Sequence, residues 1–124
     1  MAEPHRFRRA AEAKDLDLMV DALADDVVLH SPILFRGFEG KEIVAQVLTH
    51  VAATLEDLTY VDELAAGNSV CLRFTANVGD RQLEGIDYLT LDEDGKVADL
   101  TVFMRPLSAL TRFNEQMAER LGVA

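Results

Sequence analysis

The sequence predicts a single small α+β domain, and three observations support this. Apolar residues recur at three- and four-residue steps in the first part of the chain, alternate in short runs between residues 58 and 105, and return to helical spacing near the end. At 124 residues the chain is in the usual size range of one domain, so we expect 1–124 to form a single domain. Helices before and after an antiparallel meander are typical of a sheet with one covered face.

The first helical stretch is expected to divide into two helices, at about 4–13 and 15–24. Phe7 and Ala11 fit the apolar face of the first helix, and Met19 and Leu23 fit that of the second. Asp15 lies between them, and its carboxylate can accept hydrogen bonds from the free backbone N–H groups of a new helix. We therefore expect a break at Lys14–Asp15.

A short strand and a helix should follow. The β-branched run 27–31 predicts a strand that ends at Pro32. Residues 33–40 contain two glycines and are expected to form a loop. Helical spacing from Ile43 to Val51 predicts a helix that ends near residue 54.

The second half predicts four strands and a closing helix. The expected strands are Leu58–Leu64, Ser69–Val78, Arg81–Leu91 and Val97–Arg105. They are separated by the pairs Gly67-Asn68, Gly79-Asp80 and Asp94-Gly95, which suit tight antiparallel hairpins. Pro106 begins a final helix with one apolar stripe, which is expected to end at Gly122.

Asp87 is the principal candidate for a functional residue. Alternation along Arg81–Leu91 places its side chain on a face that is otherwise apolar, and the neighbouring strands continue this face with apolar rows. Loss of water disfavours the charged form of a carboxylate, so we predict a raised pKa for Asp87. A neutral carboxylic acid that faces a cavity could donate a hydrogen bond to a ligand oxygen. The alternative is that Asp87 bonds a buried group and never meets a ligand.

Charge and composition exclude several classes of partner. Twelve basic and twenty-two acidic residues give a net charge of −10, which repels nucleic acid and anionic membrane surfaces, so we expect neither as a partner. The lone cysteine, Cys71, cannot form an internal disulfide, so we expect a cytoplasmic protein. No paired His or Cys spacing typical of a metal site occurs, so we expect no metal.

Several short segments resemble the nuclear transport factor two-like superfamily, which includes ketosteroid isomerases and SnoaL-like cyclases. They are Asp15-Leu16-Asp17, Leu23-Ala24-Asp25-Asp26-Val27, Ser31-Pro32, Gly85-Ile86-Asp87-Tyr88 and Asp94-Gly95-Lys96-Val97. The resemblance implies a cystatin-like α+β roll. Its cone-shaped, curved, mixed and mostly antiparallel sheet would be wrapped by N-terminal helices and followed by a C-terminal helix.

The resemblance also places the isomerase site on this chain, with a divided result. Asp87 falls where that family has its protonated, oxyanion-binding aspartic acid. Ser31 stands where the family has its aspartate base, and Phe7 where it has a tyrosine. A serine hydroxyl needs an activating partner to move a carbon-bound proton, which argues against standard ketosteroid isomerisation. An epoxide hydrolase site would need a second acid, but Leu100 and Val102 occupy those positions.

His30 is a conditional catalytic candidate. Alternation turns it away from Ser31 and Asp87, which favours a surface or subunit-contact role. A bulge near His30 could turn the ring inward, and an acid–base pair of His30 with Asp87 would then be possible.

Three functional hypotheses follow. The first is a pocket for a small apolar ligand with a carbonyl or hydroxyl group, of steroid, terpenoid or polyketide type, anchored by Asp87. Its predicted lining is Phe7, Leu29, Ser31, Leu72, Phe74, Leu89, Val102 and Met104. The second is an isomerase, cyclase or hydrolase that needs no cofactor, and the third is a dimerisation domain without a ligand.

The opposite face of the sheet predicts a subunit contact. Ile86, Tyr88, Thr101 and Phe103 fall there by alternation, and no predicted helix remains to cover them. Exposed apolar and aromatic area of this kind marks an interface, so we expect a homodimer formed through the outer sheet face.

Overall fold

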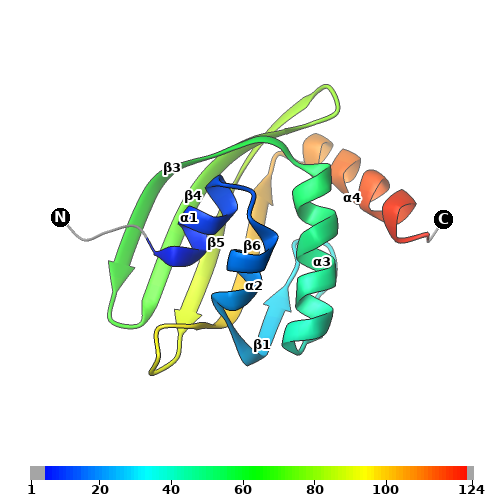
Figure 1. Cartoon of the computed structure of the whole chain (residues 1–124). Coiled ribbons are helices and arrows are strands. Elements are labelled where there is room, and N and C mark those ends of the chain that lie inside the picture. The colour runs from blue at the N-terminus through cyan, green and yellow to red at the C-terminus, as the bar shows by residue number, and fades with distance from the viewer. Residues whose placement is uncertain (1–4, 123–124) are drawn as a thin grey trace.

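The computed structural model describes residues 5–122, which form one six-stranded sheet and four helices (Figure 1). The strand order across the sheet is β2-β1-β6-β5-β4-β3. The strands are β1 (Leu23–His30), β2 (Phe38–Glu39), β3 (Glu56–Ala66), β4 (Ser69–Val78), β5 (Arg81–Leu91) and β6 (Val97–Arg105). The helices are α1 (Arg6–Glu12), α2 (Leu16–Asp21), α3 (Lys41–Thr54) and α4 (Leu107–Leu121).

The sheet is mixed and mostly antiparallel, as predicted. The strands from β3 to β6 form an antiparallel meander, β2 pairs antiparallel with β1, and β1 pairs parallel with β6. The parallel pair joins the N-terminal part of the chain to the last strand, so the meander and the helical elements form one unit. The predicted α+β class, with N-terminal helices and a C-terminal helix, is confirmed.

The predicted break between the first two helices is present, but the second helix is shorter than predicted. The Asp15 carboxylate accepts a hydrogen bond from the backbone N–H of Leu18 at 3.1 Å and caps α2. The helix ends at Asp21, and Leu23 already belongs to β1, where it pairs with Val97. Tertiary pairing thus overrides the helical spacing at this boundary.

The segment expected to be a loop before α3 contains a two-residue strand. Phe38 pairs with Leu29 and Glu39 with Val28, which makes β2 the outer edge of the sheet. The later elements were predicted more accurately. Strands β4, β5 and β6 have the predicted bounds, and β3 extends two residues beyond its prediction at each end. Helix α4 lies between the predicted Pro106 and Gly122, which are its N-cap and C-cap.

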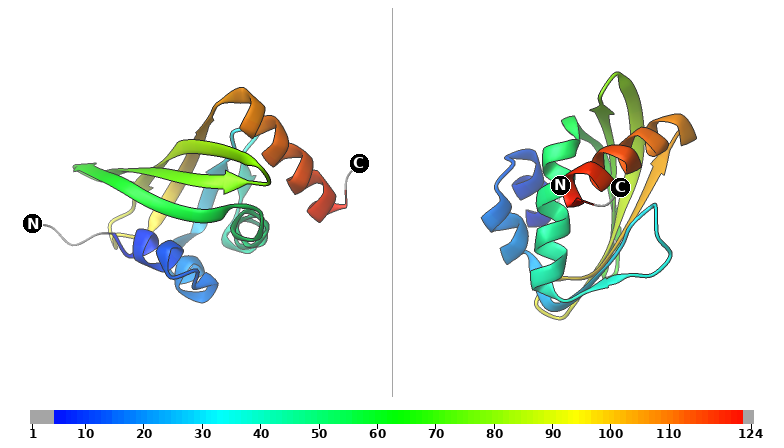
Figure 2. Two further views of the ribbon diagram at one scale, coloured as in Figure 1. Left: turned by 90° about the horizontal axis from the view of Figure 1, so that it is seen from above. Right: turned by 90° about the vertical axis from the view of Figure 1, so that its right-hand side faces the viewer.

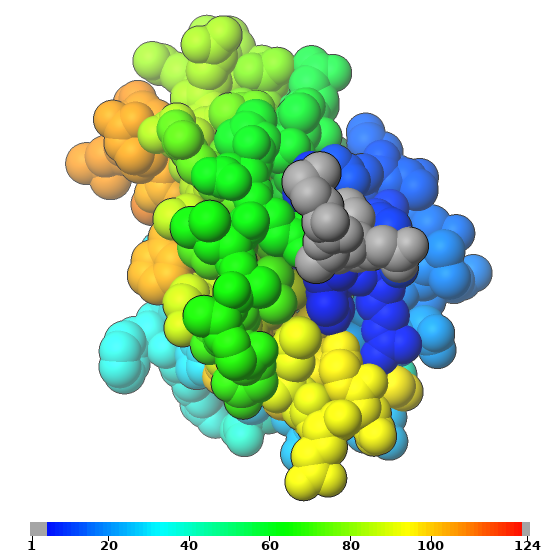
Figure 3. Space-filling view, turned by 90° about the vertical axis from the view of Figure 1, so that its left-hand side faces the viewer, coloured from blue at the N-terminus to red at the C-terminus, as the bar shows by residue number. Residues whose placement is uncertain are grey.

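The sheet curves, and all four helices lie toward its concave side or its end (Figure 2). The core fills the space between, and 26 apolar side chains of residues 5–122 are buried. At the other edge of the sheet, β3 is at the molecular surface, with α1 beside it (Figure 3). No helix between residues 5 and 122 is long and apolar enough to cross a membrane.

Candidate functional site

A largely apolar cavity lies between the concave face of the sheet and the helices. Its volume is about 320 Å³, within the range of small-molecule pockets. Strands β1, β3, β4, β5 and β6 supply its floor, and α3 and α4 supply much of its wall. Apolar side chains from these helices line it: Val47, Leu48, Val51, Phe113, Met117 and Leu121, together with Leu55 at the C-cap of α3.

Asp87 is the charged side chain at the buried end of this cavity. It lies on β5 between Leu72 of β4 and Val102 of β6, and only 8% of it is exposed. The strand alternation predicted this position correctly.

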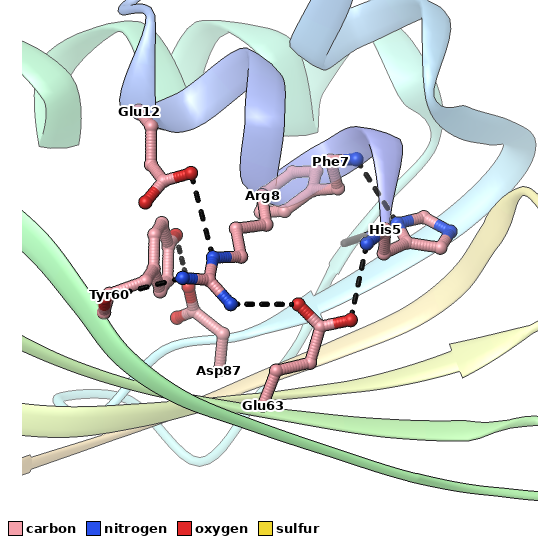
Figure 4. Close-up of polar contacts among 7 residues, drawn as sticks. All are labelled: His5, Phe7, Arg8, Glu12, Tyr60, Glu63 and Asp87. Atoms are coloured by element: carbon pink, nitrogen blue, oxygen red, sulfur yellow. Dashed lines mark hydrogen bonds and ion pairs between the residues drawn. The ribbon is translucent and has the colours of Figure 1, made fainter. Parts of the chain in front are cut away.

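Asp87 has one hydrogen-bond partner among the described residues, the hydroxyl of Tyr60. The Tyr60 Oη donates to Asp87 Oδ2 at 2.8 Å, and Tyr60 is itself 5% exposed (Figure 4). Both side chains line the cavity. The other carboxyl oxygen, Oδ1, accepts no hydrogen bond from the described part of the chain.

The surroundings of this pair set its protonation. Burial raises the pKa of Asp87 to about 6, and the hydrogen bond from Tyr60 partly offsets this because it stabilises the charged form. Burial also raises the pKa of Tyr60 well above its usual value, and the Asp87 charge adds to this, so the phenol stays protonated. The predicted direction for Asp87 is confirmed. With a pKa of about 6, however, Asp87 is mostly ionised at neutral pH rather than neutral.

The structure brings most of the predicted pocket residues together. The predicted residues that line the cavity are Phe7, Leu29, Ser31, Phe74, Val102 and Met104. Leu72 and Leu89 do not line it and correct the prediction. Both are fully buried in the core, because neighbouring side chains close over them before the cavity begins.

His30 does not line the cavity, so it does not form the acid–base pair with Asp87 that was considered as an alternative. Its Nε2 is 3.1 Å from Oδ2 of Asp99, and this pair is partly exposed to solvent. Leu29 and Ser31, on either side of it, line the cavity, so the regular alternation holds and no bulge turns His30 inward. His30 therefore cannot serve as a base for a molecule held beside Asp87.

Ser31 is at the cavity wall, but its hydroxyl is engaged by the loop that follows. The Ser31 Oγ accepts hydrogen bonds from the backbone N–H groups of Ile33 and Leu34, at 3.3 and 3.1 Å. Ile33 and Leu34 also line the cavity and are exposed, so this turn shapes the cavity mouth.

Tyr60 is the functional candidate that the sequence reasoning missed. A buried carboxyl group needs a hydrogen-bond donor, and Tyr60 is the aromatic residue on the strand next to β4. A buried acid together with a tyrosine on a nearby strand could therefore have indicated the Tyr60–Asp87 pair from the sequence. The predicted lining also contains no residue of α3 or α4, so it lacks the helical wall of the cavity.

The described residues contain no group of three or more His, Cys, Asp or Glu side chains that could hold a metal ion. Besides Ser31, Tyr60 and Asp87, the polar side chains that the described residues bring to the cavity are Lys14 and Asn114, and both are exposed. The polar chemistry of the buried part therefore rests on Tyr60 and Asp87.

Residues 5–100 match the family model of the SnoaL-like domain. No curated protein matches the chain significantly. Among solved structures, a steroid delta-isomerase from Pseudomonas aeruginosa is 36% identical with a TM-score of 0.89, over 94% of this chain and 86% of that one. An uncharacterised cystatin-like protein from Silicibacter pomeroyi DSS-3 is 29% identical with a TM-score of 0.90, over 94% and 83%.

A computationally designed 17-OHP binder shares the fold at 20% identity, with a TM-score of 0.65 over 84% of this chain and 88% of that one. At this identity the likeness concerns the fold alone. The predicted resemblance to the nuclear transport factor two-like superfamily, with a cystatin-like fold, is confirmed.

Proposed function

The chain belongs to the SnoaL-like domain family, and we propose that it binds a small, largely apolar ligand through an oxygen held at Asp87. One observation carries this proposal. The buried Tyr60–Asp87 pair lies in a cavity with an otherwise apolar interior, and one carboxyl oxygen of the pair accepts no hydrogen bond from residues 5–122. A few placed polar groups in an apolar cleft are typical of small-molecule sites.

The ligand we propose is of steroid, terpenoid or polyketide type. A carbonyl group would accept a hydrogen bond from protonated Asp87, and a hydroxyl group would donate one to the carboxylate. Similarity to the Pseudomonas aeruginosa steroid delta-isomerase supports the steroid class. With a pKa of about 6, Asp87 is open to both ligand types near neutral pH.

The second candidate is an isomerase or cyclase without a cofactor. A group with a pKa close to the working pH is well suited to general acid–base catalysis, and Asp87 meets that condition. Because His30 lies outside the cavity, this proposal assigns both the acid and the base role to Asp87. Tyr60 would then stabilise charge on the carboxylate.

Titration with a steroid ketone and its matched alcohol at several pH values tests the binding proposal. The ketone needs protonated Asp87, so its affinity should be highest below the pKa and fall as the pH rises through about 6. Only about 1% of a group with that pKa is protonated at pH 8, so we expect a loss of at least about tenfold between pH 5 and pH 8. The alcohol should keep its affinity at the higher pH.

Asp87→Asn is the informative variant, because its amide keeps the size and an acceptor for Tyr60 but cannot titrate. It should bind the ketone with an affinity that no longer depends on pH. Isothermal titration calorimetry measures both series, with Asp99→Asn on the outer side as the control. If the ketone binds equally well at pH 5 and pH 8, or Asp87→Ala leaves its affinity unchanged, Asp87 is not the anchor.

Exchange of α-protons on a bound ketone tests the enzyme proposal. Proton NMR in D2O should show exchange that depends on Asp87 and is lost in Asp87→Asn. Binding without exchange above the buffer rate would exclude general-base chemistry and leave the binding proposal intact.

We also propose that two copies associate through the outer face of the sheet. Tyr88 and Phe103 are 42% and 56% exposed there, on adjacent strands. Light scattering after gel filtration should give a dimer, and Phe103→Ser should favour the monomer, whereas Leu18→Ser on α2 should not. A monomer at every protein concentration would contradict this proposal.

A further inference from the structure

A bulge in β3 brings Glu63 onto the same face of the sheet as Tyr60. Tyr60 pairs with Phe74, and Asp62 pairs with the adjacent Arg73, so Val61 is an extra residue without a cross-strand partner. Beyond the bulge, Glu63 pairs with Leu72. Because Phe74 and Leu72 both point to the inner face, Tyr60 and Glu63 also share that face, although they are three residues apart.

Arg8 of α1 contacts the strand at this bulge (Figure 4). Its Nη2 donates to the backbone carbonyl of Tyr60 at 3.4 Å, and its Cζ lies 5.9 Å from the centre of the Tyr60 ring. Arg8 thus holds Tyr60 by both the main chain and the ring, while the phenol at the far end of the same ring bonds Asp87.

Two carboxylates hold the guanidinium of Arg8 in place. Its Nη1 donates to Oε1 of Glu63 at 3.1 Å, and its Nε lies 3.5 Å from Oε1 of Glu12. The other oxygen of Glu63 accepts from the backbone N–H of His5 at 3.2 Å. The Arg8 Nε is buried and has no hydrogen-bond partner among residues 5–122, so the guanidinium lies beside Tyr60 although one of its donors is unsatisfied there.

We propose that Arg8 is a positioning residue for the ligand site: it fixes Tyr60 at the bulge so that the phenol stays hydrogen-bonded to Asp87. The inference rests on the proposed function, because it assigns a role toward the pair that would hold the ligand. A cation over the ring face also favours the polarised phenol as a donor. Loss of Arg8 should therefore weaken the Tyr60–Asp87 hydrogen bond and make Asp87 easier to protonate.

The alternative is that Arg8 only ties α1 to the sheet. Its ion pair with Glu63 joins residues 55 positions apart, and such a contact could serve stability alone. The two roles differ in one measurable respect. A tie affects melting of the protein, whereas a positioning residue also changes the titration of Asp87.

The test is a ¹³C NMR titration of the Asp87 carboxyl group in the ligand-free protein. Tyr60→Phe gives the full effect of losing the phenol, which should raise the midpoint above the wild-type value. Arg8→Met should raise the midpoint by at least half as much as Tyr60→Phe does. We expect a rise of ~0.5 pH units, which is about threefold in proton affinity. Arg6→Met, on the same helix but outside this network, should leave the midpoint unchanged.

A double-mutant cycle separates an effect through Tyr60 from a direct electrostatic one. In the Tyr60→Phe background, Arg8→Met should shift the Asp87 midpoint by less than about 0.2 pH units, because the coupling between the two sites is already lost. If Arg8→Met does not fold, Arg8→Lys and Glu63→Gln serve instead and should give smaller shifts in the same direction.

Variants that fold and melt at lower temperature but keep the wild-type midpoint would overturn the proposal and leave Arg8 as a tie. An equal shift with and without the Tyr60 hydroxyl would overturn it too. Because the titration needs no ligand, it remains decisive even if no steroid ketone binds. Where the ketone does bind, the pH at which its affinity falls should move upward with the Asp87 midpoint.

Discussion

Two carboxylates on β5 show how differently the two faces of one sheet treat the same chemical group. Asp87 points to the inner face, where burial raises its pKa to about 6. Glu84, three residues earlier, points to the outer face, where its pKa is lowered, chiefly by a hydrogen bond from Arg105 and further by the charge of Arg73. Nη1 of Arg105 lies 3.0 Å from Oε1 of Glu84, and Nη2 of Arg73 lies 3.5 Å from Oε2.

The difference between these two groups is solvation and partners rather than residue type. On the outer face, water and two arginines stabilise the ionised form of a carboxylate. The inner face offers one phenol and apolar side chains, so an acid there titrates near neutral pH. A carboxyl group kept under such conditions is a candidate for function, and this is why the proposal rests on Asp87 rather than Glu84.

Gly85→Ala should have the largest effect on stability, because it adds volume to the inner face beside Asp87. A Cβ atom at Gly85 would overlap the backbone oxygen of Phe103 and lie 2.6 Å from Cζ of Phe74. A backbone oxygen cannot move aside cheaply, so we expect a loss of about 3 kcal/mol in the free energy of unfolding. Urea denaturation measures this loss. Thr75→Ala on the outer face should change stability by less than ~0.5 kcal/mol, and equal effects of the two would contradict the packing argument.

Asp87→Asn should have the next largest effect, and only at higher pH. The folded protein binds the Asp87 proton more tightly than the unfolded chain does, so this group's contribution is complete below a pH of about 4 and is lost as the pH rises through about 6. Asparagine does not titrate, so the variant does not lose this stability as the pH rises. Its stability relative to wild type should therefore rise between pH 4 and pH 8, by up to about 3 kcal/mol for a two-unit shift.

Urea denaturation at several pH values, supported by circular dichroism, gives this difference directly. Asp99→Asn is a suitable control, because Asp99 is partly exposed and pairs with His30 outside the cavity. A stability difference between Asp87→Asn and wild type that stays constant from pH 4 to pH 8 would mean that Asp87 does not carry a raised pKa.

The meander and its faces could be predicted from the sequence because local rules determine them. Alternation along Arg81–Leu91 and the turn at Asp94-Gly95 fixed β5, β6 and the inward direction of Asp87 before any tertiary contact was considered. At Leu23, by contrast, pairing with β6 decides the structure, and helical spacing gave the wrong element.

The candidate site was only partly predictable, because two of its features depend on contacts between distant segments. Tyr60 and Glu63 share a face through the bulge at Val61, and period-two alternation cannot show this. Alternation also cannot show which residues of a face reach the cavity. Leu72 lies on the predicted inner face, but it is fully buried and does not line the cavity.

Glu84→Gln should give the smallest effect and the opposite dependence on pH. The pKa of Glu84 is lower in the folded than in the unfolded state, so the charged group stabilises the fold when the pH is above its unfolded pKa. This stabilisation is lost as the pH falls through the folded pKa. The variant should therefore be slightly less stable than wild type at neutral pH and indistinguishable from it in acid. Because the three side chains on this face are in contact with solvent, salt at ~1 M should remove the neutral-pH difference. Thermal melts with and without salt measure this, and Arg105→Gln should reproduce most of the effect. A Glu84→Gln difference that exceeds that of Asp87→Asn, or that persists in high salt, would show that the two faces do not differ in solvation as the structure indicates.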